Sequence, residues 1–190
     1  LFGKCHMTLL GDINQKINHY QEKVNDKDIF KGARSVKLDK SYRSTYQIAK
    51  FCNDMLKDNL DIKYFNRQGK QPEILNLNTA DLDVIANTVI NKVSKYRASG
   101  HRSLAVITRT EAFAKKLQPY LKDAKINRVT EKSTTYTYGA VLIPSYLTKG
   151  LEFDAVIVLD TQNDRLKKEE ELHLFYTCCT RALHELTVIN

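Results

Sequence analysis

Short apolar runs alternate along this chain with segments of helical periodicity, and that order limits the possible folds more than any other feature. Runs with strand character lie at residues 6–10, 35–38, 73–77, 104–108, 128–130, 140–143, 156–160 and 186–189. Helices are expected at residues 45–57, 82–99, 169–183 and from 111 to Pro119, which should end or kink that helix. This order predicts an α/β domain in which a mainly parallel sheet lies between helix layers, with sites at the carboxyl edge of the strands.

The composition fits a folded domain that can bind a polyanion. The 190 residues are 42% hydrophobic and include only 7 Gly and 3 Pro, which is unlike a disordered chain. Thirty Lys and Arg against 22 Asp and Glu give a net charge of +8, which favours phosphate-rich partners. Basic surfaces also serve solubility, so the charge alone does not decide between the two roles.

The cysteines and the apolar runs indicate a cytoplasmic protein. Cys5, Cys52, Cys178 and Cys179 lack the C-x-x-C spacing of metal or redox motifs, so we expect reduced thiols in the core and no metal site. The apolar runs are far shorter than the roughly 18 residues of a membrane span, and no signal segment opens the chain. We therefore expect no membrane partner.

Two islands in the N-terminal part place polar side chains after expected strands. In Gly11-Asp12-Ile-Asn-Gln15, a carboxylate and an amide can contact water, metal or a terminal phosphate, and a plain Gly-Asp turn is the alternative. In Tyr42-Arg43-Ser44, Arg43 is expected at the carboxyl edge of the sheet, where a guanidinium can hold a phosphate. A capping turn with a solvated arginine is the alternative.

Two further islands lie in the C-terminal part. In Lys149-Gly150-Leu151-Glu152-Phe153 the glycine lets the backbone approach a ligand, and Glu152 can accept hydrogen bonds from ribose hydroxyls. In Thr180-Arg181-Ala182, Arg181 is expected near the end of an apolar helix, where it can stabilise charge on a transferring phosphoryl group. The alternatives are a glycine turn with a solvated acid and an arginine that complements the helix dipole.

Taken in order, the islands G-D-x-x-Q, Y-R-S, K-G-L-E-F and T-R-A resemble the signatures of UvrD/Rep-type superfamily 1 DNA helicases, over residues 11–182. The resemblance implies a three-layer RecA-like fold in an ATP-dependent DNA helicase. Such helicases bind ATP between two RecA-like domains and translocate on single-stranded DNA. Only about forty residues separate the expected strand at 104–108 from K-G-L-E-F. This spacing resembles the short helicase IV-like branch, which lacks the large helical insertion.

The resemblance also assigns roles to individual residues. It implies that Gln15 senses the γ-phosphate and that Arg43 and Arg181 contact it from the second domain. It further implies that Glu152 binds the ribose and that Lys149 faces the phosphates. Gly150 and Asp12 are the other expected nucleotide-binding residues.

The same resemblance implies three DNA-binding residues. Tyr20 stands nine residues after Gly11, where the family stacks an aromatic ring on a base, a contact worth about 1 to 3 kcal/mol. An ordinary exposed aromatic is the alternative for Tyr20. Ser145 and Tyr146 lie where the family contacts the DNA backbone, with Tyr146 in place of the usual histidine.

The chain lacks the residues of a complete ATP site. It contains no G-x-x-x-x-G-K-[ST] loop and no paired acids after a strand, since Thr161 and Gln162 follow Asp160. We therefore expect residues 1–34 to be a remnant of the first motor domain with an arm, and residues 35–190 to be the second RecA-like domain. ATP and Mg²⁺ would bind only together with the missing N-terminal RecA-like domain of the same parent, so the chain alone should be catalytically inactive.

A second class of function stays open. The chain can be a non-catalytic nucleic-acid-binding or protein-interaction module with a degenerate helicase fold. A phosphate-binding loop upstream in the parent would favour the motor, whereas a native start near Leu1 would favour the module. Single-stranded DNA is the expected partner of the motor, and transcription or repair machinery is an open further partner.

Overall fold

The computed structural model describes residues 40–56, 63–133, 138–160 and 169–190, together with the single residues Thr8, Arg34 and Val36. The island that contains Asp12 and Gln15 lies outside the described residues, as do Tyr20 and Cys5, and the expected strand at 6–10 is described only at Thr8. The expected strand at 35–38 is described only at Val36, and the boundary expected after residue 34 is likewise not tested.

Six strands form a parallel sheet. They are β3 (Glu73–Leu75), β4 (Ser103–Thr108), β5 (Ile126–Arg128), β6 (Gly139–Pro144), β7 (Phe153–Leu159) and β8 (Ala182–Ile189). Their order is β3-β8-β7-β4-β6-β5, and every neighbouring pair is parallel. The α/β fold with a mainly parallel sheet is thereby confirmed.

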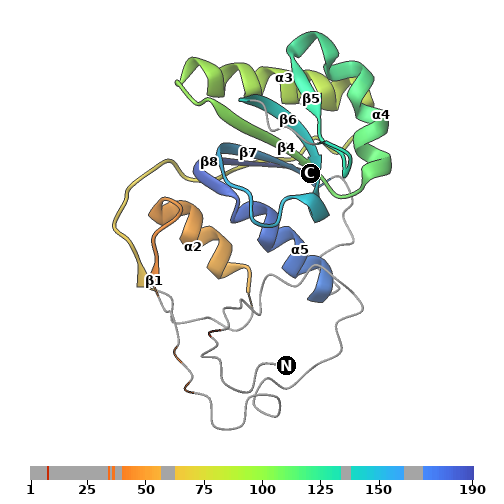
Figure 1. Cartoon of the computed structure of the whole chain (residues 1–190). Coiled ribbons are helices and arrows are strands. Elements are labelled where there is room, and N and C mark those ends of the chain that lie inside the picture. The colour runs from red at the N-terminus through yellow and green to blue at the C-terminus, as the bar shows by residue number, and fades with distance from the viewer. Residues whose placement is uncertain are drawn as a thin grey trace, which may run out of the picture.

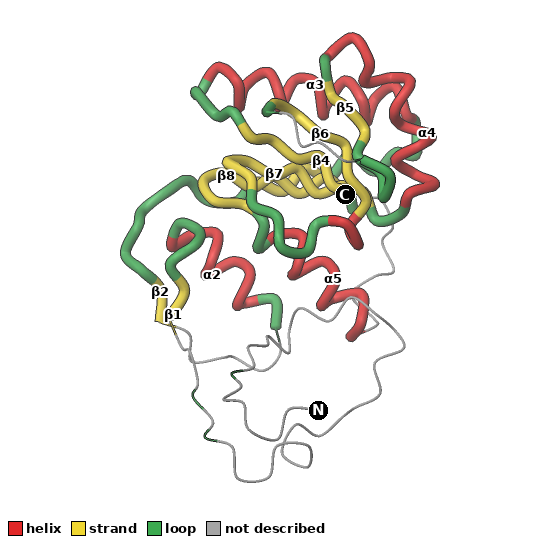
Figure 2. Tube along the Cα trace, viewed as in Figure 1, coloured by secondary structure: helices red, strands yellow, loops and turns green. Residues whose placement is uncertain are grey.

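Helices cover both faces of this sheet. Helices α3 (Leu82–Ala98) and α4 (Glu111–Leu121) lie on one face, and α2 (Tyr46–Asp54) and α5 (Glu169–Cys179) lie on the other (Figure 1). A small parallel pair, β1 (Lys40–Ser41) and β2 (Lys63–Tyr64), lies beside α2, as Figure 2 shows. The short 3-10 helices η2 (Lys122–Ala124) and η3 (Ser145–Leu147) follow α4 and β6.

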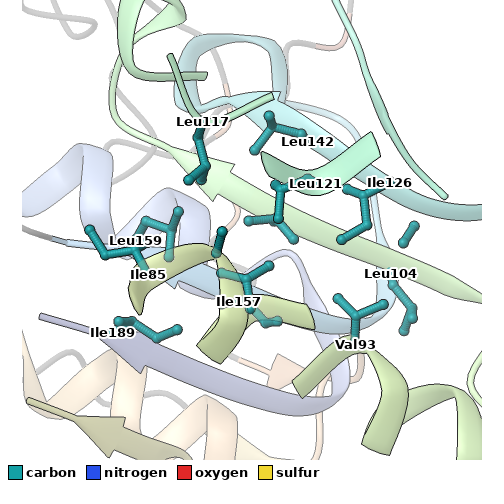
Figure 3. Close-up of a cluster of buried hydrophobic side chains, with 14 of the residues drawn as sticks. Ile85, Val93, Leu104, Leu117, Leu121, Ile126, Leu142, Ile157, Leu159 and Ile189 are labelled. Carbon is teal, nitrogen blue, oxygen red and sulfur yellow. The ribbon is translucent and has the colours of Figure 1, made fainter. Parts of the chain in front are cut away.

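The central strands contribute to two hydrophobic cores, one on each face of the sheet. In β4, Leu104 and Val106 belong to the core beneath α3 and α4, which Figure 3 shows. Ala105 and Ile107, the alternate residues, belong to the core beneath α2 and α5. Successive side chains of a strand point to opposite faces, so burial on both faces accounts for the continuous apolar runs in the sequence.

Several element ends differ from the sequence prediction, among them those of α4 and α5, and the strand expected at 128–130 lies at Ile126–Arg128. Helix α4 continues through Pro119 to Leu121. The burial of Leu117 and Leu121 in the core beneath this helix offsets the hydrogen bond that the proline cannot donate. Helix α5 ends at Cys179 rather than at residue 183, because Ala182 already pairs with Phe153 at the start of β8.

The described cysteines behave as core residues. Cys52, Cys178 and Cys179 are reduced and buried, as expected. Burial raises the pKa of the Cys179 thiol, so this group stays protonated at neutral pH. A search of the described residues finds no helix that is long and apolar enough to cross a membrane.

Candidate functional site

Three of the candidate residues, drawn from distant parts of the chain, lie together at one edge of the sheet. Glu152 immediately precedes β7 and Arg181 immediately precedes β8, the neighbouring strand. Arg43 lies just before α2, and its Nε donates a hydrogen bond to Oε1 of Glu152, 109 residues away. The fold therefore brings the Y-R-S, K-G-L-E-F and T-R-A islands together at this edge of the sheet.

This edge is the amino edge of the parallel strands, so the expectation that Arg43 lies at the carboxyl edge is wrong. Arg43 follows β1, which belongs to the small sheet rather than the main one. The next two residues attach it to the start of β8. The Ser44 hydroxyl donates to the carbonyl of Ala182 at 2.6 Å, and the Thr45 amide donates to the carbonyl of Leu183 at 3.2 Å.

Arg181 is a buried cation held by several acceptors. It lies in the turn after α5, not within the helix as expected, and is only 1% exposed. Its guanidinium donates to the carbonyl of Thr177 at 3.0 Å, the hydroxyl of Thr180 at 3.2 Å and the carbonyl of Leu151 at 3.4 Å. Burial first, and then the positive charge of Arg43, lower the pKa of Arg181. The charges of Arg181 and Arg43 therefore interact electrostatically.

The ion pair between Arg43 and Glu152 is open to solvent. The two side chains are 40% and 45% exposed. An exposed pair of this kind contributes at most about 1 kcal/mol to stability. The ion pair can therefore open at a small cost in free energy when a ligand binds. The guanidinium can then pair with a phosphate, and the carboxylate can accept a hydrogen bond from a hydroxyl group.

A tight turn before β7 presents Glu152. The Thr148 amide and hydroxyl both donate to the carbonyl of Ser145, at 3.1 and 2.7 Å, and the Leu151 amide donates to the carbonyl of Thr148 at 3.0 Å. Gly150 has a φ of +84°, a conformation that other residues adopt only with strain. Lys149, beside this glycine, is exposed. The turn supplies the Glu152 carboxylate at this edge, and the exposed Lys149 lies three residues before it.

The two described DNA-binding candidates lie at the opposite, carboxyl edge. Ser145 and Tyr146 belong to η3, which directly follows β6. Ser145 is 3% exposed and donates its hydroxyl to the carbonyl of Arg109 at 2.8 Å, so this hydroxyl is already engaged within the domain. Tyr146 is 37% exposed and accessible to a partner.

A small cavity lies beside Ser145. Its volume of about 30 Å³ is enough for roughly one water molecule. Arg109 and Glu171, which form an ion pair, are part of its lining together with Phe175 and Cys178. The cavity is too small to hold a nucleotide.

Sequence reasoning missed an exposed aromatic pair beside Arg43. Tyr42 is 61% exposed, and its ring centroid lies 5.6 Å from that of Phe65, which is 47% exposed. The Lys40 ammonium group lies 5.1 Å from the centre of the Tyr42 ring. Two exposed rings near a cation can stack on a planar ligand. The position of Tyr42 within the Y-R-S island was the available signal, whereas no local pattern pointed to Phe65.

The donor set of the site suits an organic phosphate better than a metal ion. In the described part of the chain, no three His, Cys, Asp or Glu side chains gather in a way that could hold a metal. Guanidinium groups pair with phosphate oxygens, whereas magnesium needs several oxygen ligands. The residues therefore fit one side of a nucleotide site, and a metal would need ligands from elsewhere.

The six-stranded parallel sheet and its helix layers define the class as a RecA-like α/β domain. Residues 139–189, which include Glu152 and Arg181, match the family model described as the UvrD-like helicase C-terminal domain. The solved C-terminal domain of a possible DNA helicase from Lactobacillus plantarum WCFS1 is 31% identical, with a TM-score of 0.64, over 78% of this chain and 86% of that one. No curated protein matches the chain. The chain belongs to the UvrD-like helicase C-terminal domain family.

Proposed function

We propose that the chain is the second motor domain of an ATP-dependent DNA helicase or translocase of the short, helicase IV-like branch. In this proposal it forms one wall of an ATP site, and the N-terminal RecA-like domain of the same parent forms the other. The observation that carries the proposal is the group of Arg43, Glu152 and Arg181 at the amino edge of β7 and β8. Membership of a helicase family supports it.

The group supplies what ATP hydrolysis needs from a second domain. Positive charge aimed at the γ-phosphate stabilises the charge that spreads over the phosphoryl oxygens in the transition state. Arg181 is already fixed by its acceptors, and Arg43 moves from Glu152 to the phosphate when ATP binds. The freed carboxylate accepts hydrogen bonds from the ribose, and Lys149 and Gly150 face the phosphates. The phosphate-binding loop and the magnesium ligands come from the partner domain, and Gln15 with Asp12 complete the phosphate contacts.

Single-stranded DNA is the proposed track. Tyr146 is exposed at the carboxyl edge, on the opposite side of the sheet from the nucleotide, and stands near the start of the helicase-family match. The Ser145 hydroxyl already donates to the backbone carbonyl of Arg109, so the backbone around Ser145 is better suited than this hydroxyl to contact a phosphate. Tyr20 is the proposed base-stacking residue. The net charge of +8 favours a polyanion.

The test is Arg43→Ala in the full-length parent. We expect DNA-stimulated ATP hydrolysis to fall by about 10³-fold, in the range of arginines that contact a transferring phosphoryl group. Stability should change little, because the Arg43 side chain is 40% exposed. Lys116→Ala is the matched control, since it removes one exposed positive charge from α4 on the other face of the sheet. An unchanged rate in Arg43→Ala would overturn the proposal.

Arg181 gives a less clean test. Arg181→Ala should reduce hydrolysis by a similar factor of about 10³. Its guanidinium, however, donates to three buried or half-buried acceptors, so the alanine variant also leaves the carbonyls of Thr177 and Leu151 without this donor. We expect that loss to cost about 1 to 3 kcal/mol of stability, and the folding of this variant must be measured beside its rate.

A further inference from the structure

The segment of residues 67–70 packs onto the turn that carries Arg43. The Tyr46 amide donates to the carbonyl of Arg67 at 2.8 Å, and the Gly69 amide donates to Oε1 of Gln47 at 2.8 Å. Gly69 lies so close to Thr45 that a Cβ at this position would overlap the threonine side chain. The segment therefore contacts the first residues of α2 directly, immediately after Arg43.

The same segment also binds the start of β8. Nη2 of Arg67 donates to the carbonyl of Leu183 at 3.1 Å and contacts Nδ1 of His184 at 2.8 Å. The carbonyl of Leu183 is the one that also accepts the Thr45 amide. One acceptor, two residues beyond Arg181, thus joins Arg67 to the turn that carries Arg43.

The state of His184 suits this contact. A guanidinium is always a donor, so Nδ1 of His184 must be the acceptor and the imidazole must be neutral. Burial, followed by the charges of Arg67 and His101, lowers the pKa of His184 below its usual 6.5, which favours the neutral form. The His184 ring also stacks on His101, with centroids 5.7 Å apart.

A second side chain of the segment reaches the same strand. Nζ of Lys70 donates to Oε1 of Glu185 at 2.8 Å, and Nε2 of His101 lies 3.1 Å from the same oxygen. Arg67 and Lys70 thus attach the segment to consecutive residues of β8, His184 and Glu185. The segment links α2 to the strand that begins directly after Arg181.

We propose that the 67–70 segment sets the position of Arg43 relative to Arg181, and that Arg67 is a positioning residue for ATP hydrolysis. This inference rests on the proposed function of the two arginines. Among the described residues, the exposed Arg43 side chain is held by Glu152 and through its backbone turn, so the turn determines where the guanidinium can reach. Removing Arg67 takes a charged donor away from the carbonyl that orients this turn. A displacement of about 1 Å at a catalytic group can cost up to about 10²-fold in rate.

The experiment is a double-mutant cycle in the full-length parent with Arg67→Ala, Arg43→Ala and both together. We expect Arg67→Ala to lower kcat for ATP hydrolysis by about 10- to 100-fold, with KM for ATP changed by less than about twofold. In the Arg43→Ala background, adding Arg67→Ala should lower kcat by less than about twofold further, because the residue acts through Arg43. Arg67→Lys keeps a charged donor, so its kcat should lie between that of the wild type and that of Arg67→Ala.

Arg97→Ala is the matched control. Arg97 also uses its guanidinium to bind two backbone carbonyls, those of Ala124 at 2.9 Å and Lys125 at 3.1 Å, but in the layer of α3 and α4. The Arg97→Ala substitution should lower stability and leave kcat for ATP hydrolysis unchanged. If Arg67→Ala does not fold, Arg67→Lys and Gly69→Ala, whose Cβ must displace Thr45, take its place in the cycle.

The outcomes separate the two proposals. If Arg43→Ala lowers kcat but Arg67→Ala behaves like Arg97→Ala, the positioning role is overturned and the proposed function stands. Multiplicative effects of the two substitutions would also overturn it, since Arg67 would then act independently of Arg43. If Arg43→Ala itself leaves the rate unchanged, the proposed function fails first.

Discussion

At the scale of the residue, the two arginines of the site differ in how they are held. Arg181 is buried and donates to acceptors from α5 and from the turn before β7, so its position is set before any ligand arrives. Arg43 is exposed and paired with Glu152. Fixed charges stabilise a transition state without reorganisation, whereas an exposed pair can open for a ligand. The site therefore combines one rigid and one exchangeable cation.

Glu152→Ala tests the exchangeable pair. We expect stability to fall by less than about 1 kcal/mol, because the pair is exposed, as measured by urea denaturation of the chain. KM for ATP in the parent should rise by about tenfold or more, since hydrogen bonds to a carboxylate are worth about 1.5 to 3 kcal/mol.

Asp54→Ala is the control for this variant. Asp54 pairs with Lys50 in α2, and the two side chains are 54% and 51% exposed. The stability change should match that of Glu152→Ala while KM stays at the wild-type value. Equal KM values in the two variants would show that Glu152 does not contact the nucleotide.

At the scale of the element, turns rather than regular structure carry the site. Glu152 follows the Thr148–Leu151 turn, Arg181 lies between α5 and β8, and Arg43 lies between β1 and α2. Strand β7 and the second half of β8 are almost completely buried, whereas the connections before them are more accessible. The precision of the site therefore depends on how these turns are fixed.

Gly150→Ala tests the turn before β7. The residue has a φ of +84° with open space where a Cβ would lie, so alanine should cost about 1 kcal/mol through backbone strain alone. Gly100→Ala provides the comparison, because Gly100 has a φ of +88° and the same open space but lies between α3 and β4. Both variants should lose similar stability in urea denaturation, and only Gly150→Ala should lower ATP turnover by the parent, by about tenfold. A loss of turnover in both would point to a general effect of stability.

At the scale of the whole molecule, six parallel strands form a covered sheet, and the proposed site lies at one edge of it. Helices cover both faces of the sheet (Figure 1), and each face has its own core, of which Figure 3 shows the one beneath α3 and α4. Arg43, Arg181 and Glu152 supply two cations and a carboxylate, and the described residues contain no cluster that could hold a metal. The chain should therefore fold by itself and still need a second domain for its ligand.

Thermal unfolding of the chain with and without ATP and Mg²⁺ measures this dependence. A ligand that binds only the folded state raises the melting temperature according to its concentration relative to Kd. We expect ATP to bind this chain weakly, because half of the proposed site is missing, so millimolar ATP should raise its melting temperature by less than about 1 °C. The melting temperature of the parent should rise clearly. A large shift, or robust ATP turnover by the chain alone, would mean that it holds a complete site.

Much of the fold and of the family could be predicted from local patterns. Apolar runs such as 104–108 and 156–160 are buried on both faces, and strands of that kind occur in parallel sheets covered by helices. The islands around Arg43, Glu152 and Arg181 predicted the UvrD-like helicase family, and the match to the family model confirms it. Element ends were less predictable. The helix period continues through Arg181, but pairing of Ala182 with Phe153 converts these residues to turn and strand.

The sequence by itself determined which faces are buried and which residue types can handle a phosphate, because periodicity and motif order are local properties. Only the tertiary structure decided where those residues meet. Strands β7 and β8 are neighbours in the sheet, so Glu152 and Arg181 share its amino edge, and bonds from Ser44 and Thr45 to β8 bring Arg43 there. Arg67 belongs to no motif, and its contact with Leu183 spans 116 residues. Such contacts depend on strand order and packing, which no local pattern encodes.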